Sequence, residues 1–164
     1  MAKLKRSAHL LYIDATFGGT TPSWFLIGKH VEDLSIELNP NTEITKNILD
    51  ETSAVDNGYE PSTDVDTYYA DPADGTFYEK MKDIAMNRKT GDDCRTKVLE
   101  ILVDSDATES GFDGYDGWTE DVLVKPTSYG GAQGGFRIPY TITFDGNRTQ
   151  GKWDVTNKVP TVHT

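Results

Sequence analysis

The segment FRIPYTITFD, residues 136–145, decides the fold class of this chain. Large apolar side chains occupy every second position: Phe136, Ile138, Tyr140, Ile142 and Phe144. Side chains alternate between the two faces of a β-strand, so this period of two predicts a strand with one buried face and one wet face. Pro139 cannot donate a hydrogen bond to a neighbouring strand, which predicts an edge or a local irregularity there.

Further strands are predicted on the N-terminal side of this segment and after it. Residues 31–39 alternate in the same way, whereas residues 96–103 and 119–125 are β-branched and apolar in places on both faces, which is typical of strands between two layers. The shorter candidates are residues 10–13, 23–27 and 150–155. Asp145-Gly146-Asn147 predicts a tight turn into the last strand.

One amphipathic helix is predicted over residues 72–89. Asp71 is a suitable N-cap, Pro72 suits the first helical position, and Gly91 follows as a stop. The helix carries one apolar stripe, formed by Phe77, Met81, Ile84 and Ala85. Such a helix must pack on a sheet to bury its stripe. We therefore expect a mainly β single domain over residues 1–164, an antiparallel β-sandwich or half-barrel with one flanking helix.

The stretch from Asn47 to Tyr78 contains eight acidic side chains and no Lys or Arg. It also contains several apolar and aromatic residues, so it differs in composition from a solvated acidic tail. A long excursion inside a small strand-rich domain is usually a functional arm or a disordered linker. The aromatic content favours a long acidic arm loop over residues 47–70.

The charge of the chain is one-sided, with a formal net charge of −11. A surface of this kind repels phosphates, which argues against a protein that binds DNA or RNA. Residues 122–164 reverse the local balance, with five bases against Asp145 and Asp154. The presence of both signs on one molecule suits head-to-tail association of identical subunits, although ordinary solvated surface explains it equally well.

The sequence contains no recognisable catalytic, metal or cofactor motif, and we expect no enzyme. The three histidines are isolated, and Cys94 is the only cysteine, for which a structural role is expected. The acidic loop at residues 104–116 fails the calcium-loop pattern, because Glu109 stands where glycine is needed and Tyr115 where Glu is needed. No apolar run is long enough to cross a membrane.

A glycine-rich loop, residues 128–135, precedes the strand of residues 136–145. Four glycines in six positions predict a tight turn or close backbone contact. With Tyr129 before it, the loop is either a hairpin tip that contacts a neighbouring subunit or a flexible loop.

Several segments, taken in order, resemble the tail tube (major tail) proteins of tailed bacteriophages and of related phage-tail-like particles. They are WFLIGK at residues 24–29, the arm, FYEKMKDIAMNRKTGDDCRTKVLEILV at residues 77–103, and SYGGAQGGFRIPYTITFDGNRTQGKWD at residues 128–154. The resemblance covers most of the chain. Its weight lies in the order of sheet, long loop, helix, glycine-rich hairpin and terminal strand.

The resemblance implies hexameric rings that stack into a hollow tube, a conduit for DNA, or for ions in a bacteriocin-like particle. The implied partners are copies of the chain itself, together with sheath, tape measure and tail-tip or baseplate proteins. Assembly would take place in the cytoplasm of a bacterial host, for a place in the virion tail, with no membrane involved and DNA only in transit. About six copies would carry roughly −66 per ring, which would keep DNA from adhering.

Two sets of candidate site residues follow. The polar positions of strands are candidates to line the tube: Ser35, Glu37, Asn39, Thr141 and Thr143. The same face could instead meet bulk solvent or a partner. Candidate subunit contacts are the arm's apolar residues and the loop aromatic, namely Val55, Tyr59, Val65, Tyr68, Tyr69 and Tyr129. Arg148 and Lys152 are the bases expected to receive the arm's acids.

Two other functions remain open. A Gly- and Tyr-rich β-sandwich with three tryptophans could be a carbohydrate-binding module, with Trp118 expected in a loop and Trp24 and Trp153 in strands. A tail terminator, which shares the sandwich but forms a single ring, is the other alternative.

Overall fold

The computed structural model describes residues 3–29 and 31–163. Its main feature is a seven-stranded antiparallel sheet in the order β2-β1-β6-β7-β8-β5, with β9 also paired to β8. The sheet strands are β1 (His9–Asp14), β2 (Trp24–Leu26), β5 (Ser62–Val65), β6 (Arg95–Leu102), β7 (Tyr115–Pro126), β8 (Tyr140–Thr156) and β9 (Val159–Val162). Strands β3 (Pro40–Lys46) and β4 (Thr52–Tyr59) form a separate hairpin.

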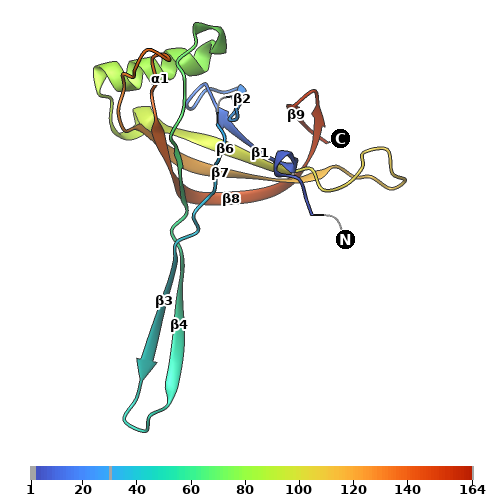
Figure 1. The fold of residues 1–164 in the computed structure, drawn as a ribbon. Coiled ribbons are helices and arrows are strands. Elements are labelled where there is room, and N and C mark those ends of the chain that lie inside the picture. Colours follow the sequence, from blue (N-terminus) through green and yellow to red (C-terminus); the bar gives the residue numbers. More distant parts are fainter. Residues whose placement is uncertain (1–2, 30, 164) are drawn as a thin grey trace.

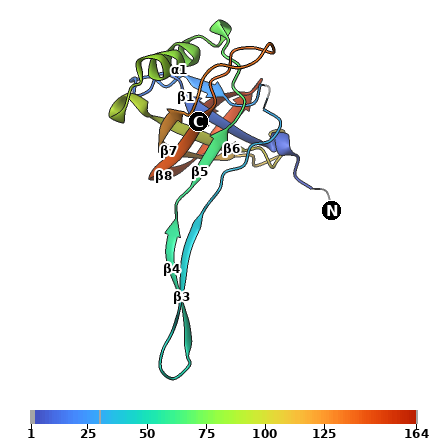
Figure 2. The ribbon, with the colours of Figure 1, turned by 60° about the vertical axis from the view of Figure 1, so that its left-hand side comes forward.

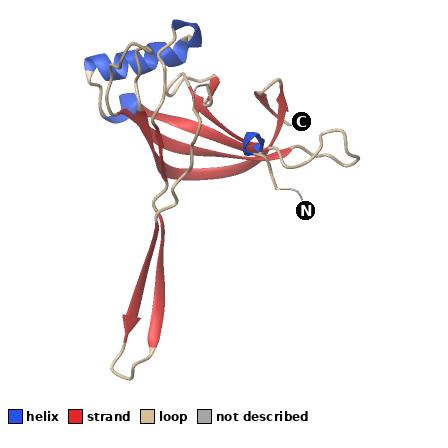
Figure 3. Ribbon diagram, in the orientation of Figure 1, coloured by secondary structure: helices blue, strands red, loops and turns tan. Residues whose placement is uncertain are grey.

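The sheet is strongly curved, and helix α1 (Thr76–Asn87) packs on it at one end (Figure 1). The β3–β4 hairpin projects away from the sheet in both views (Figure 1, Figure 2). Three short 3-10 turns, Arg6–Ala8, Pro72–Asp74 and Gly91–Cys94, complete the ordered elements among the described residues (Figure 3). The predicted mainly β half-barrel with a flanking helix is confirmed.

The larger core lies between α1 and one face of the sheet. All four residues of the predicted helix stripe are buried, and Phe77 stacks on Phe25 with 4.1 Å between ring centroids. The sheet contributes alternate residues of its strands to the same cluster, including Val98, Val122 and Ile142. The face of α1 that packs on the sheet is therefore the one that the spacing of its apolar residues predicts.

A smaller core lies on the opposite face. It contains Tyr12, Leu99, Ile101 and Tyr115, all buried. Leu99 follows Val98, so the two neighbours point to opposite faces and join different cores. This explains why β6 is apolar on both faces, as its sequence predicts.

The helix boundaries differ from the prediction. Asp71 is a cap as expected, accepting a hydrogen bond from the Ala73 backbone at 2.9 Å, but it caps the preceding 3-10 turn. Gly75, at φ 67°, separates that turn from α1. The helix ends at Arg88, which adopts the left-handed conformation, while Gly91 opens the next 3-10 turn.

The prediction of a turn at Asp145-Gly146-Asn147 is wrong. Strand β8 continues through it, and the positive φ angles of Gly146 and Asn147 form a bulge against β7. The turn into the last strand lies at Asn157 and Lys158, both with positive φ as a two-residue hairpin turn requires. Residues with positive φ occur in both hairpin turns and β-bulges, so the sequence alone does not distinguish the two structures here.

Two further strand predictions need correction. Residues 31–39 form no strand; they run as a loop with one isolated bridge, from Glu37 to Ser62. Their alternation reflects Leu34 and Ile36 packing on the core from a loop. Strand β7 begins four residues earlier than predicted, so Trp118 lies in a strand and not in a loop.

Candidate assembly interface

The β3–β4 hairpin has almost no contact with the rest of the chain. Every residue of β3 is exposed, and Gly58 is the only residue of β4 that is half-buried. A two-stranded hairpin is only marginally stable in water by itself. The predicted arm is thus a hairpin over residues 40–59, beginning earlier and ending earlier than residues 47–70. The sequence missed β3 because a strand exposed on both faces carries no apolar period.

The hairpin tip is ordered by Asn47. Its Oδ1 accepts hydrogen bonds from the backbone of Leu49 at 2.9 Å and of Glu51 at 3.1 Å. Its Nδ2 donates to the Glu51 carboxylate at 2.9 Å. This arrangement leaves Ile48 100% exposed and Leu49 71% exposed. Two bare aliphatic side chains at the end of an ordered projection indicate a contact surface.

The predicted arm contacts fall into two groups. Val55 and Tyr59 lie on the hairpin and are exposed. Val65 and Tyr68 are buried, because the chain after the hairpin joins the sheet as β5 and then enters the larger core. The Tyr68 hydroxyl donates to Asp74 at 3.0 Å. The interpretation of Val65 and Tyr68 as interface anchors is therefore wrong.

The glycine-rich loop is a hairpin connection between β7 and β8. Gly130 and Arg137 exchange backbone hydrogen bonds of 3.1 and 2.7 Å. A Cβ on Gly135 would lie 3.1 Å from the ring of Tyr69, which is half-buried against the loop. Tyr129 is exposed at the loop's start, with its ring 6.3 Å from that of Phe136. Of the two tyrosines, Tyr129 is the one presented for outside contact.

Arg148 and Lys152 already have acidic partners in their own chain. Arg148 Nη1 lies 3.0 Å from carboxylate oxygens of both Glu100 and Glu120. Lys152 Nζ lies 2.8 Å from the Asp116 carboxylate, and the two residues face each other across β7 and β8. The assignment of these bases as receivers of the arm's acids is corrected accordingly.

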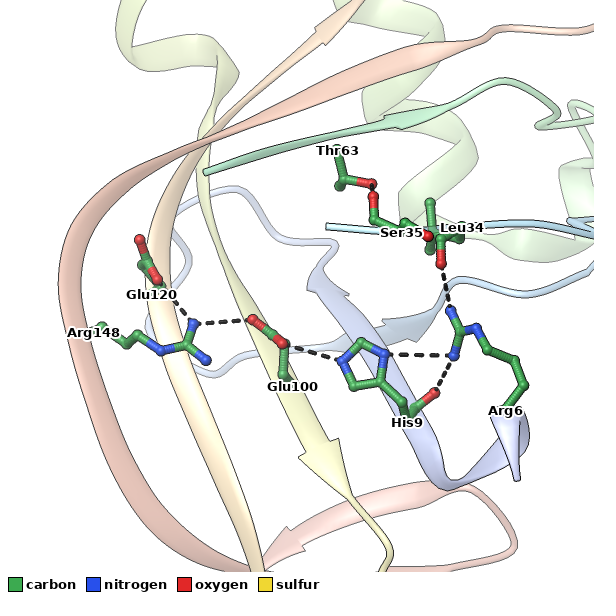
Figure 4. A network of polar contacts seen from close by, with 8 residues as sticks. All are labelled: Arg6, His9, Leu34, Ser35, Thr63, Glu100, Glu120 and Arg148. Carbon is green, nitrogen blue, oxygen red and sulfur yellow. Dashed lines mark hydrogen bonds and ion pairs between the residues drawn. The ribbon is translucent and has the colours of Figure 1, made fainter. Parts of the chain in front are cut away.

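Glu100 is the centre of a polar network on the sheet (Figure 4). It is 8% exposed, and His9 Nε2 lies 3.1 Å from its second carboxylate oxygen. Arg6 continues the network, donating to the backbone oxygens of His9 and Leu34 at 3.0 Å. Burial alone would raise the pKa of Glu100, but the hydrogen bonds from His9 and Arg148 outweigh it and hold the pKa below its ordinary value. The network fixes the N-terminal segment and the loop at Leu34 to the sheet.

The five polar candidates for the tube lining gather around β5. Thr141 and Thr143 pair with Asp64 and Ser62 of that strand, and Thr141 Oγ1 donates to Asp64 at 2.8 Å. Ser62 also bridges Glu37. The other two candidates, Ser35 and Asn39, are exposed in the adjoining loop, where Asn39 donates to the Glu60 backbone at 3.0 Å. Strand β5 therefore brings the two halves of the predicted set together on one surface.

The tryptophans do not form a sugar-binding platform. Trp24 and Trp153 meet edge to face, with centroids 6.3 Å apart, next to the smaller core. The Arg148 guanidinium lies 5.5 Å from the centre of the Trp118 ring. All three side chains are only partly exposed. The carbohydrate-binding alternative loses its main support.

No group of three or more His, Cys, Asp or Glu residues among the described residues could hold a metal ion. In the acidic loop, the exposed Asp106 carboxylate accepts hydrogen bonds from the backbone and the hydroxyl of Thr108, at 2.9 and 2.7 Å. Cys94 is fully buried and contacts the Lys89 backbone oxygen at 3.3 Å, in keeping with a structural role. Within residues 3–29 and 31–163, no helix has the length and apolarity needed to cross a membrane.

Comparison with known structures finds similarity to a sheath/tube terminator and to a tube-terminating cap. The chain superimposes on the sheath/tube terminator of an extracellular contractile injection system in its extended state, with a TM-score of 0.52, 8% identity, and coverage of 92% of this chain and 97% of that one. It superimposes on the tube-terminating cap of the anti-feeding prophage with a TM-score of 0.50, 12% identity, and coverage of 93% of both chains. No protein-family model and no curated protein matches the sequence. At these identities the likeness shows a shared fold, over nearly the whole length of each chain.

Proposed function

We propose that this chain is a structural subunit that assembles with its own copies into rings, which stack into the hollow tube of a phage tail or tail-like particle. The observation that carries the proposal is the β3–β4 hairpin, an ordered projection whose exposed aliphatic side chains are covered by no other described residue of the chain. The segment order of the sequence resembles tail tube proteins, and the fold is shared with tube-terminating proteins of related particles. The role is one of assembly and not of catalysis.

The sheet provides a means of closing a ring. Strand β2 forms one edge, and β5 and β9 form the other, both pairing with β8. Edge strands carry unpaired backbone groups that can pair with another chain. Because the sheet is curved, edge-to-edge pairing of successive subunits would turn around an axis and close, which makes a head-to-tail ring.

The surface around β5 is our candidate for the tube lining. It presents Thr141 and Thr143 beside the acids Glu37 and Asp64. Carboxylates repel the phosphates of a DNA backbone and neutral hydroxyls add no charge attraction, so DNA would pass without adhering. Val55, Tyr59 and Tyr129 remain candidates for contacts between subunits, together with the hairpin tip.

A tube-terminating ring is the second candidate. It is favoured by the fold likeness to a terminator and a cap over at least 92% of this chain. In that role the hairpin would reach into the last ring of a different tube protein, and sheath contacts would surround it. The two candidates share ring formation and differ in whether rings of this chain stack on one another.

Negative-stain electron microscopy of the purified protein over a range of concentrations separates them. Tubes of stacked rings are expected. Single rings that never stack would favour the terminator. Protein that stays monomeric at every concentration, both alone and after addition of an extract that contains tail tips to initiate assembly, would contradict both functions.

A further inference from the structure

A groove at the C-terminal end of α1 combines basic and apolar side chains. Arg88 and Lys89 line it from the helix end, and Lys125 lines it from β7. Ile84, Pro126 and Tyr129 supply apolar surface. None of the lining residues is acidic, although the chain as a whole carries a net charge of −11. The groove is therefore a local exception to the charge of the molecule.

The two bases at the helix end have no acidic partner within the described chain. Arg88 is exposed and Lys89 half-buried, and neither forms an ion pair with a described Asp or Glu. Lys125 Nζ donates to the Lys89 backbone oxygen at 3.0 Å and is likewise not neutralised by a carboxylate. These groups differ from Arg148 and Lys152, whose charges are already balanced.

The hairpin tip has the complementary composition. Residues 47–51 carry Ile48 and Leu49 beside Asp50 and Glu51, and no base. Asp50 has only a loose contact with Lys46, at 3.7 Å between exposed side chains. Two aliphatic and two acidic side chains on the tip match an apolar wall and three cations in the groove.

The two surfaces lie at opposite ends of the molecule. Helix α1 is at the top and the hairpin tip at the bottom in two views that share a vertical axis (Figure 1, Figure 2). The tip cannot reach the groove of its own chain in this arrangement. A second copy placed head to tail would bring its tip to the α1 end of the first, and the contact would repeat without limit.

We propose that the groove lined by Arg88, Lys89, Lys125 and Tyr129 receives the hairpin tip of a second copy of this chain. The proposal rests on the ring-forming function and adds the receiving surface for the stacking contact. Aliphatic side chains of the tip pack on Ile84, Pro126 and Tyr129, and its carboxylates meet the unpaired bases. Attraction between opposite charges also orients the two rings, because the reverse stacking would place like surfaces together.

Charge reversal on each side tests the contact. The groove variant is Arg88→Glu with Lys89→Glu, and the tip variant is Asp50→Lys with Glu51→Lys. Each variant should raise the concentration needed for stacking by about tenfold or more, measured by pelleting and microscopy. Mixing the two variants should restore stacking, because each tip then meets a groove of opposite charge. A matched control, Lys80→Glu with Lys82→Glu, makes the same charge change on α1 outside the groove and should stack like the wild type.

A cross-link provides the second measurement. Leu49→Cys with Ser128→Cys should give a reducible ladder of covalent oligomers on mild oxidation, whereas Leu49→Cys with Thr108→Cys should not. Cys94 is fully buried and does not interfere.

The outcomes separate this proposal from the ring-forming function. A groove variant that stacks like the wild type, or a mixture that does not recover, overturns the tip-in-groove contact and leaves the tube function standing. Wild-type rings that never stack, together with no ladder from the Leu49→Cys, Ser128→Cys variant, overturn it in favour of a terminator. Wild-type protein that forms no rings, together with no cross-link in that variant, overturns both.

Discussion

At the scale of single residues, the buried charges of Glu100 and Glu120 share one partner, Arg148. Both carboxylates are buried, at 8% and 6% exposure, and both depend on Arg148. A buried carboxylate that loses its partner keeps the full cost of its lost hydration. The ion pairs of Lys152, in contrast, lie on the open surface and are screened by water.

Arg148→Met should therefore destabilise the subunit by about 2 kcal/mol, less than for a fully buried pair because the guanidinium is itself partly exposed. Urea denaturation at neutral pH measures the change. Lys152→Met serves as the control and should leave the denaturation midpoint unchanged. Equal effects of the two substitutions would show that the buried carboxylates do not depend on Arg148.

The lowered pKa of Glu100 predicts a pH dependence with a definite sign. The unfolded chain binds the proton more readily than the folded one, so Glu100 stabilises the fold above its ordinary pKa of 4.5 and this contribution is lost as the pH falls below that value. The free energy of unfolding of dilute protein should drop between about pH 5 and pH 3, with a shallower slope in Glu100→Gln. An identical slope in the two proteins would contradict this origin.

At the scale of elements, the hairpin and the sheet have separate roles. No residue of β3 or β4 is buried, so the hairpin adds nothing to either core. Strand β5 follows it closely and does belong to the sheet. Removing residues 56–66, which lie inside the predicted arm, would destroy β5 and with it the pairing to β8.

Replacing residues 42–57 with a two-residue Asn-Gly turn should leave the melting temperature within about 2 °C of the wild type, since only exposed residues are removed. The same variant should lose stacking, as measured by sedimentation velocity. Stacked assemblies of undiminished length would show that the hairpin is not the stacking element.

The sequence predicted most elements whose pattern reports burial, although it missed β5, which lies inside the predicted arm and has buried residues. The stripe of α1, the alternation of β8 and the two apolar faces of β6 follow from side chains that meet a core. Strand β3 contacts neither core, so its sequence has no apolar period that would predict a strand. Gly146 and Asn147 specify positive φ, a requirement common to turns and bulges, and only pairing with β7 decides between them. Charge partners such as Arg148 with Glu100, 48 residues apart, depend on a register that no local pattern encodes.

At the scale of the whole molecule, the surface around β5 should decide how an assembled tube treats DNA. Glu37→Lys with Asp64→Lys would place cations there and should make tubes retain short duplex DNA on pelleting at low salt, which wild-type tubes should not do. The matched control, Asp104→Lys with Glu109→Lys, changes the acidic loop between β6 and β7. Equal retention by both variants would argue against a lining role for the β5 surface.

We propose three surfaces for three contacts of one chain: sheet edges for closing a ring, the β5 surface for the channel, and a tip and groove for stacking. The sheet edges present backbone groups, the β5 surface presents hydroxyls and carboxylates, and the tip and groove present aliphatic and charged side chains. Because the three compositions differ, each surface would favour its own kind of contact.

A cryo-electron microscopy reconstruction of the assembled protein would show whether the hairpin makes the stacking contact. We expect the β3–β4 hairpin of each subunit to cross the boundary between rings, with its tip against the α1 end of a subunit in the next ring. A reconstruction in which the hairpin lies against its own ring, or projects unbound into solvent, would contradict it.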